Sequence, residues 1–350
     1  MISVIIPCYN SVSTISKYVQ SVLNQTFNNV EIIIVNDCST DKSMVRLLDL
    51  QKKFPQKIVL LDKKKNEGVD HARFDGLKIA KGDFITFLDA DDWLEKKALE
   101  VMYSEMSHND YDYVEIGIQR VMGRLGLIRK RTSYVVKGEI ALPELFDRYF
   151  LSFFGVNILS VNMSGKLYRK SFLDSLSLKP SGLAMGEDLY FNLSLFPYLK
   201  KIKIIDYVGY NYRFGGMTTK YNPFLLPNLE YLYSRKRELA EKYKYTKAIP
   251  FLLIELKNVL KSDIKQRIVF RYENKSDMII DMKKLFHEKT SFQELWTYYK
   301  NINHKDRSEF VVALREQNFE RMYEACFKEV QAERNIRIIK RVVNTICKYI

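Results

Sequence analysis

The stretch Phe84-Ile-Thr-Phe-Leu-Asp-Ala-Asp-Asp92 joins a hydrophobic strand to three carboxylates. Aromatic and β-branched residues favour a buried strand, and the turn after it would hold the carboxylates near the edge of a sheet. Three anions so close together repel one another unless a cation shares them. The stretch therefore predicts a site for Mg²⁺ or Mn²⁺, which suit carboxylate and phosphate oxygens together.

One of these carboxylates has a simpler interpretation. An Asp directly before a helix commonly caps its first turn. We therefore predict that Asp92 caps a helix beginning near Trp93, and that Asp89 and Asp91 belong to the site.

The residues before this stretch predict a parallel sheet. Through about residue 95, β-branched runs alternate with helical patterns, which is typical of a sheet covered by helices. The predicted strands are Ser3–Pro7, Glu31–Asp37, Ile58–Asp62 and Phe84–Asp89. The fold class is therefore α/β with a mostly parallel sheet.

Polar or turn-forming clusters follow three of the predicted strands. They are Pro7-Cys-Tyr-Asn10, Asn36-Asp-Cys-Ser-Thr-Asp41 and Asp89-Ala-Asp-Asp92. In open α/β sheets, ligands gather outside the carboxyl ends of the strands. We therefore expect the three clusters to face one crevice.

The composition indicates a folded protein with an anionic partner. Hydrophobic residues make up 47% of the 350 positions, and the formal net charge is +14. Such a charge suits nucleic acid, a phosphate-bearing small molecule or an acidic membrane surface. The four cysteines show no close pair and no metal-ligand spacing, which favours a reducing, cytoplasmic compartment. We expect no transmembrane segment, because no apolar stretch reaches roughly 20 residues.

The chain changes character near Tyr221, where glycine disappears and helical patterns begin. We predict one domain over residues 1–220 and a helical region over residues 221–350. The last 17 residues, Arg334–Ile350, hold five basic and no acidic side chains, with isoleucines along one face. This pattern is typical of a helix on an anionic membrane surface, here the inner face of the cell membrane. A terminal helix packed on its own domain would share it.

Four motifs, in order, resemble those of glycosyltransferase family 2. They are Val4-Ile-Ile-Pro-Cys-Tyr-Asn10, Val35-Asn-Asp-Cys-Ser-Thr-Asp41, Asn66-Glu-Gly68 with Ala72-Arg73, and Phe87-Leu-Asp-Ala-Asp-Asp92. The resemblance covers roughly residues 1–215. It implies a GT-A fold and an inverting enzyme that uses a nucleotide diphosphate sugar.

The resemblance implies a role for each residue on the nucleotide side of the site. Pro7, Tyr9 and Asn10 would lie beside the nucleotide, and Asp37 would accept a hydrogen bond from the base. A carboxylate that accepts from a ring N–H favours uracil without excluding other bases, so a UDP-sugar is the expected donor. Arg73 is similar to the family's basic residue near the base and phosphates.

Other residues would serve the leaving diphosphate. By resemblance, Asp89 would approach the ribose or a metal-bound water, and Asp91 would ligate the metal. Arg213, with Gly215-Gly216, is similar to a mobile phosphate-directed loop, and Lys166 matches a family lysine. Either basic residue could instead be a surface charge, Lys166 more readily than Arg213.

The segment Gly186-Glu-Asp-Leu-Tyr-Phe-Asn192 resembles the part of the family that supplies the catalytic base, and we assign that role to Asp188. In inverting transfer, the acceptor hydroxyl must lose its proton on the face opposite the departing diphosphate. Composition alone would make Glu187 and Asp188 a charged first turn of a helix that runs to Leu195.

The chain also departs from the family pattern. Ser164-Gly165 stands where the family often has Trp-Asn, and residues that are usually small or amides are replaced by Asp70, His71, Phe74 and Asp75. Contacts to the donor sugar and the acceptor therefore cannot be carried over, although His71 is a candidate sugar contact. The processive Gln-x-x-Arg-Trp signature is absent, which favours addition of a single sugar.

Other function classes fit less well. The basic runs Lys63-Lys-Lys65 and Arg129-Lys-Arg131 accompany no nucleic-acid recognition motif and are more simply solvated faces, so we expect no nucleic-acid partner. No Gly-x-Gly-x-x-Gly follows the first strand, as a nicotinamide enzyme requires, and no glycine- and lysine-rich loop suggests a nucleotidyltransferase. The acceptor expected from the family is a glycan or lipid-linked glycan, as in capsule, O-antigen or exopolysaccharide synthesis. A non-catalytic sugar-nucleotide-binding protein of the same fold remains the alternative.

Overall fold

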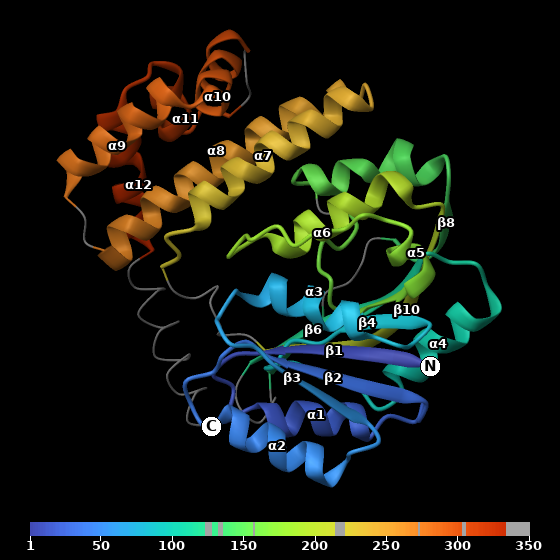
Figure 1. Cartoon of the computed structure of the whole chain (residues 1–350). Helices are drawn as coiled ribbons and strands as arrows, with labels where there is room; N and C mark the ends of the chain where they lie inside the picture. The colour runs from blue at the N-terminus through green and yellow to red at the C-terminus, as the bar shows by residue number, and fades with distance from the viewer. Residues whose placement is uncertain are drawn as a thin grey trace. The chain divides into compact units, whose positions relative to one another are not determined.

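The computed structural model describes residues 1–122, 128–131, 136–156, 158–213, 221–271, 274–302 and 306–333. The chain divides into two compact units (Figure 1). The first comprises Met1–Phe153 and Asn157–Phe214, and the second comprises Phe154–Val156 and Gly215–Ile350. The predicted catalytic, nucleotide-binding and metal-binding residues all belong to the first unit.

A sheet of ten described strands runs through the first unit in the order β3-β2-β1-β4-β9-β6-β10-β5, with β7 beside β6 and β8 beside β10. The strands are β1 (Ile2–Cys8), β2 (Val30–Asn36), β3 (Ile58–Asp62), β4 (Phe84–Phe87), β5 (Trp93–Leu94), β6 (Tyr113–Met122), β7 (Ile128–Arg131), β8 (Gly138–Ala141), β9 (Lys166–Arg169) and β10 (Lys201–Arg213). Strands β1 to β4 are parallel, and antiparallel β9 joins them to the parallel pair β6 and β10. The predicted α/β class is confirmed, and the four expected strands are β1 to β4.

Helices cover both faces of this sheet. They are α1 (Ile15–Leu23), α2 (Ser43–Lys53), α3 (Val69–Ile79), α4 (Ala98–His108), α5 (Lys170–Asp174) and α6 (Glu187–Leu195), with shorter turns at Leu145–Tyr149, Phe150–Phe154 and Phe196–Tyr198. Helices α1 and α2 lie on one face and α3 on the other (Figure 1). Gly76 allows α3 to approach closely, because a Cβ there would lie 2.5 Å from Cγ2 of Ile5. Helix α3 thereby brings its side chains directly over β1.

The predicted helix after Asp92 is wrong. Trp93–Leu94 is the short strand β5, which pairs antiparallel with β10, and the next helix, α4, begins at Ala98. Asp92 is fully buried. The local signal for a helix cap was overridden by the long-range pairing with β10, which gives this carboxyl other donors.

The second unit is helical where the structure describes it. Its helices are α7 (Leu225–Lys242), α8 (Ile249–Gln266), α9 (Lys275–Glu288), α10 (Thr290–Asn301), α11 (Glu309–Arg315) and α12 (Phe319–Ala332), with short turns at Thr246–Ala248 and Arg267–Arg271. Leucine and aromatic side chains form its buried core, among them Leu232, Leu252, Leu256, Phe292, Leu295 and Phe310. None of the described helices is long and apolar enough to cross a membrane. The predicted membrane-surface helix, residues 334–350, lies outside the described residues.

Candidate active site

Asn10 ties the loop after β1 to the loop after β2. The side-chain oxygen of Asn10 accepts from the backbone N–H of Thr40 at 2.8 Å and of Asp41 at 3.2 Å. The backbone N–H of Asn10 donates to Ser39 Oγ at 3.0 Å. Asn10 has a φ of 48°, a conformation that Asn tolerates better than most residues. Of the three polar clusters expected to face one crevice, these contacts join the first two. Pro7 is buried at the end of β1, whereas Tyr9 is 49% exposed beside it.

Asp37, just after β2, lies buried in a cluster of charges. Its carboxylate accepts from the backbone N–H of Glu67 at 3.0 Å and of Gly68 at 2.8 Å. The ammonium of Lys63 lies 3.4 Å from Asp37, and it is closer still to the carboxylates of Glu67 and Asp75, at 3.1 and 3.0 Å. The interpretation of the first basic run as a solvated face is therefore wrong for Lys63, whose side chain is only 7% exposed.

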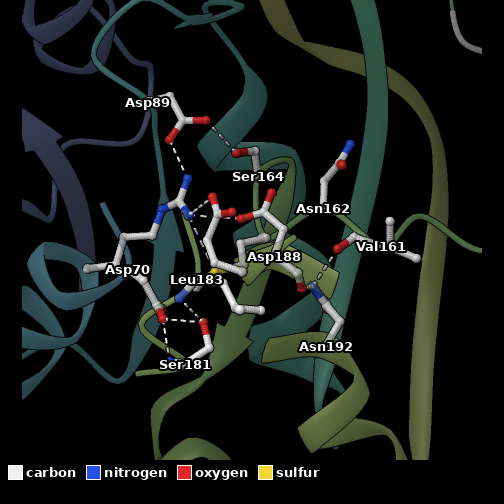
Figure 2. Close-up of polar contacts among 12 residues, drawn as sticks. Asp70, Asp89, Val161, Asn162, Ser164, Ser181, Leu183, Asp188 and Asn192 are labelled. Atoms are coloured by element: carbon white, nitrogen blue, oxygen red, sulfur yellow. Dashed lines mark hydrogen bonds and ion pairs between the residues drawn. The ribbon is translucent and has the colours of Figure 1, made fainter. Parts of the chain in front are cut away.

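Arg73 of α3 is the centre of the charged site, and Figure 2 labels two of its partners, Asp89 and Asp188. One guanidinium nitrogen donates to Asp89 at 2.6 Å, and another donates to Asp188 at 2.8 Å and Glu187 at 3.1 Å. Burial disfavours its charge, but the carboxylates of Asp89, Asp188 and Glu187 outweigh burial and raise the pKa of Arg73. Its resemblance to a residue near the base and phosphates did not reveal this ion-pair network. The guanidinium links the acidic turn after β4 to the start of α6.

Asp89 and Asp91 differ in their surroundings. Asp89 accepts from Arg73 and, at 3.4 Å, from the hydroxyl of Ser164. Burial and the neighbouring charge of Asp89 raise the pKa of Asp91 to about 6, and Arg213 opposes that shift. A partly buried carboxylate that repels its neighbour favours the arrival of a cation.

Asp92 fixes the end of β10 to the acidic turn. Its carboxyl accepts from the hydroxyl of Tyr210 at 2.7 Å and from the backbone N–H of Arg213 at 2.8 Å. Burial, followed by repulsion from Asp89 and Asp91, raises the pKa of Asp92. The arrangement holds Arg213 beside the acidic turn, where its charge acts on Asp91. Residues 214–220 lie outside the described residues, and so does the predicted loop at Gly215-Gly216.

Asp188 lies in the first turn of α6, as the sequence predicts. Gly186 precedes the helix with a φ of 86°, in the left-handed region that favours glycine. The side-chain amide of Asn192 donates to the carbonyl of Asp188 at 2.9 Å and to that of Val161 at 3.0 Å (Figure 2). Burial raises the pKa of Asp188 to about 7, against the opposing charge of Arg73. A carboxyl with such a pKa is suited to take a proton near neutral pH.

Lys166 lies in the interior of the first unit and is not a surface charge. It is fully buried, and its ammonium donates to the carbonyls of Ser160 at 2.8 Å and Asn162 at 2.5 Å. Glu115, also fully buried, lies 3.7 Å away. Burial lowers the pKa of Lys166. These contacts make it a support for the loop at residues 160–163 and correct the alternative that it is a surface charge. Its contact with a ligand stays a prediction.

Two departures from the family pattern now have a physical reason. Gly165 has a φ of 76°, and a Cβ there would lie 3.3 Å from the carbonyl oxygen of Ile116, so glycine suits the position. Ser164 contributes the hydroxyl that reaches Asp89. Residue type alone offered no signal for the roles of Ser164, Tyr210 and Asn192.

The donor chemistry of the acidic turn fits a hard divalent cation. Among the described residues, no group of three or more His, Cys, Asp or Glu side chains could hold a metal ion by itself. Mg²⁺ sites commonly use one or two carboxylates and complete the shell with water and substrate phosphates. Asp91, with its raised pKa, and Asp89 supply that minimal set. The arrangement suits a cation that arrives with a diphosphate.

Comparisons with known proteins find relatives among glycosyltransferases. The sequence model described as glycosyl transferase family 2 matches residues 3–176. The cholesterol galactosyltransferase of Borreliella burgdorferi is 24% identical over 320 residues, covering 86% of this chain and 87% of its own. The poly(ribitol-phosphate) beta-N-acetylglucosaminyltransferase TarP of Staphylococcus aureus is 30% identical over 214 residues, covering 60% and 62%.

Other relatives are longer. Glycosyltransferase GlyA of Streptococcus pneumoniae is 28% identical over 220 residues, and the match covers only 30% of its length. Among solved structures, S. aureus TarS 1–349 in complex with UDP-GlcNAc superimposes with a TM-score of 0.58 at 18% identity, covering 95% of this chain and 92% of that one. This likeness confirms the GT-A fold. By its motifs and its family match, residues 3–176 of the chain belong to glycosyltransferase family 2, and the GT-A fold agrees with that membership.

Proposed function

We propose that the protein transfers a single sugar, with inversion, from a UDP-sugar to a hydroxyl of a glycan or lipid-linked glycan. The observation that carries this proposal is the pair of ion pairs that Arg73 makes, 2.6 Å to Asp89 and 2.8 Å to Asp188. They bring a carboxylate of the acidic turn and a carboxyl with a pKa of about 7 to one guanidinium. A site that only bound a sugar nucleotide would not need the second group.

The reaction divides between these residues. The acceptor oxygen forms a bond to the anomeric carbon while the bond from that carbon to the diphosphate breaks, and Asp188 takes the acceptor's proton. Arg73 holds Asp188 near Asp89 while the carboxylates are ionised. Asp91 and Asp89 would hold Mn²⁺ or Mg²⁺, which would neutralise charge on the leaving diphosphate. Arg213 lies beside Asp91, where its cation can act on the same phosphates.

Support for the substrates comes from relatives. TarP, a beta-N-acetylglucosaminyltransferase, and a Bacillus spizizenii relative, a poly(ribitol-phosphate) beta-glucosyltransferase, are named for beta-linked products. An inverting enzyme makes beta products from donors whose sugar is alpha-linked to the diphosphate. The TarS complex contains UDP-GlcNAc. On this basis we propose a uracil nucleotide held near Asp37, and no nucleic-acid partner.

The assigned base can be tested with a matched pair of variants. Asp188→Asn should lower kcat by about 10²–10⁴-fold, the range for loss of a general base, and should leave UDP binding unchanged. Glu187→Gln is the control, because it removes a neighbouring charge that contacts the same guanidinium at 3.1 Å. The measurement is UDP release with a panel of UDP-sugars, with calorimetry for UDP. Equal losses in the two variants, or transfer at the wild-type rate by Asp188→Asn, would contradict the role of Asp188. A wild-type protein that binds UDP but transfers no sugar from any donor of the panel would favour the sugar-nucleotide-binding alternative.

A second part of the proposal concerns location. We propose that the protein is cytoplasmic and peripheral on the inner face of the cell membrane, bound through residues 334–350. The support is their five basic and no acidic side chains. Deletion of these residues should lower binding to anionic vesicles and leave UDP binding intact. Unchanged vesicle binding would contradict it.

A further inference from the structure

Residues 181–186 lead into α6, and helix α3 holds the beginning of this segment in place. One carboxylate oxygen of Asp70 accepts from the backbone N–H of Ser181, from the hydroxyl of Ser181 at 2.6 Å and from the backbone N–H of Gly182 at 3.1 Å (Figure 2). The Ser181 hydroxyl oxygen in turn accepts from the N–H of Leu183 at 3.1 Å. Asp70 is 2% exposed, so these bonds form away from water.

The same helix holds the other end of the segment. One turn after Asp70, Arg73 contacts Glu187 and Asp188. The next residue, Phe74, packs edge-on against Phe191 of α6, with 6.1 Å between ring centroids. Helix α3 therefore contacts both ends of residues 181–188 and the helix that follows.

The segment needs such a restraint. Gly182 and Gly186 both lie in the left-handed region, with φ of 70° and 86°. Glycine has more accessible backbone conformations than any other residue, so a segment with two glycines gains much freedom once its contacts are removed. A shift of about 1 Å in a reacting group can lower a rate by about 100-fold.

We propose that Asp70 is a positioning residue for the catalytic base, acting through Ser181 and Gly182 to fix where Asp188 lies. The inference rests on the proposed function, since it assumes that Asp188 takes the acceptor's proton. The hydrogen bonds of Asp70 described here are made with Ser181 and Gly182, not with Asn10 on the nucleotide side or with the acidic turn. Its effect should therefore fall on the chemical step and not on UDP binding.

The test uses the full chain and the variants Asp70→Ala and Asp70→Asn. Asp70→Ala should lower kcat by about 100-fold with the UDP affinity and the donor KM unchanged. Asp70→Asn keeps an acceptor oxygen at the same place and should recover most of the rate. Asp49→Ala is the control, because it removes a helical carboxylate whose partner is the exposed Lys53. Its rate should equal that of the wild type.

Hydrogen exchange supplies a readout independent of turnover. The amides of Ser181 and Gly182 should exchange faster in Asp70→Ala, while those of β1 and β2 stay protected. Ser181→Ala should lower kcat in the same direction but less, and adding it to Asp70→Ala should change little. If Asp70→Ala does not fold, Asp70→Asn and Ser181→Ala decide the matter by the same measurements.

Each outcome separates this inference from the proposed function. A wild-type kcat in Asp70→Ala, or a loss of UDP binding parallel to the loss of kcat, would overturn the positioning role. A wild-type protein that transfers no sugar would overturn the proposed function instead, and a fully active Asp188→Asn would overturn the assignment of the base on which the positioning role rests. In that case exchange at Ser181 and Gly182 would still show whether Asp70 restrains the segment.

Discussion

The hydroxyl of Tyr210 donates a hydrogen bond of 2.7 Å to the carboxyl of Asp92, and both residues are buried. The bond joins the end of β10 to the acidic turn after β4, 118 residues earlier in the chain. The backbone N–H of Arg213 donates to the other oxygen of the same carboxyl. Strand β10 therefore holds the acidic turn in place, and the residues near the turn in the sequence give no sign of this contact.

Tyr210→Phe should lower the free energy of unfolding by about 1–3 kcal/mol, because a buried carboxyl oxygen loses its donor. Urea unfolding would measure this change. Tyr198→Phe is a suitable control, because Tyr198 is 54% exposed and its removal should change the free energy by no more than about 0.5 kcal/mol. Equal stability of the two variants would mean that the Tyr210 bond makes no net contribution.

Lys63→Met should lower the free energy of unfolding by about 2–3 kcal/mol. The substitution leaves buried Asp37 without its cation, although two backbone N–H groups still donate to Asp37 and limit the loss. Lys65→Met is the matched control: Lys65 also pairs with Glu67, at 2.8 Å, but is 77% exposed and should show no measurable change. Thermal and urea unfolding would both report the difference, and equal stabilities would contradict the burial of the Lys63 cluster.

The pH dependence of transfer should reflect Asp188. Because the base must be ionised and its pKa is about 7, kcat/KM should rise as the pH increases through about 7, well above the range of an ordinary carboxyl. Glu187→Gln should move this rise to lower pH, since repulsion from Glu187 raises the pKa of Asp188. Initial rates across a pH series would test both statements. A rise near pH 4 in the wild type would contradict them.

Cation-dependent UDP binding should weaken as the pH falls through about 6. The pKa of Asp91 is about 6, and a proton on this carboxyl competes with a cation for the same oxygens. Calorimetry with UDP, with and without Mn²⁺, would measure the effect, and chelation should remove the part that depends on pH. An affinity that does not vary with pH in the presence of Mn²⁺ would show that Asp91 is not a ligand.

Local patterns were enough to predict much of the fold. The hydrophobic runs predicted β1 to β4, and the turn residues after β1 and β2 predicted that the clusters at residues 7–10 and 36–41 would face one crevice. The hydrogen bond between Asn10 and Asp41 agrees with that expectation. The charged first turn of α6 was also predictable, because Glu187 and Asp188 follow Gly186 and precede an apolar helix. For the strands and for α6, the pattern that allows the prediction lies within a few consecutive residues.

The ion pairs and buried charges were not predictable in this way. Arg73 meets Asp188 across 115 residues, and no local pattern encodes such a contact. Lys63 and Lys166 have the charge of surface residues, yet each lies against a buried carboxylate from another segment, Asp37 and Glu115 respectively. Asp92 was assigned to a helix because a following strand of two residues, β5, leaves almost no signal in the sequence.

The guanidinium of Arg73 also has a consequence for how this chain can diverge. One side of it contacts a turn encoded before residue 92, and the other contacts a helix encoded after residue 186. Mutations that remodel the walls around either substrate can accumulate separately on the two sides. Arg73 contacts both sides, so a substitution there would require compensating substitutions on each side. Descendants that acquire new acceptors should therefore keep this arginine.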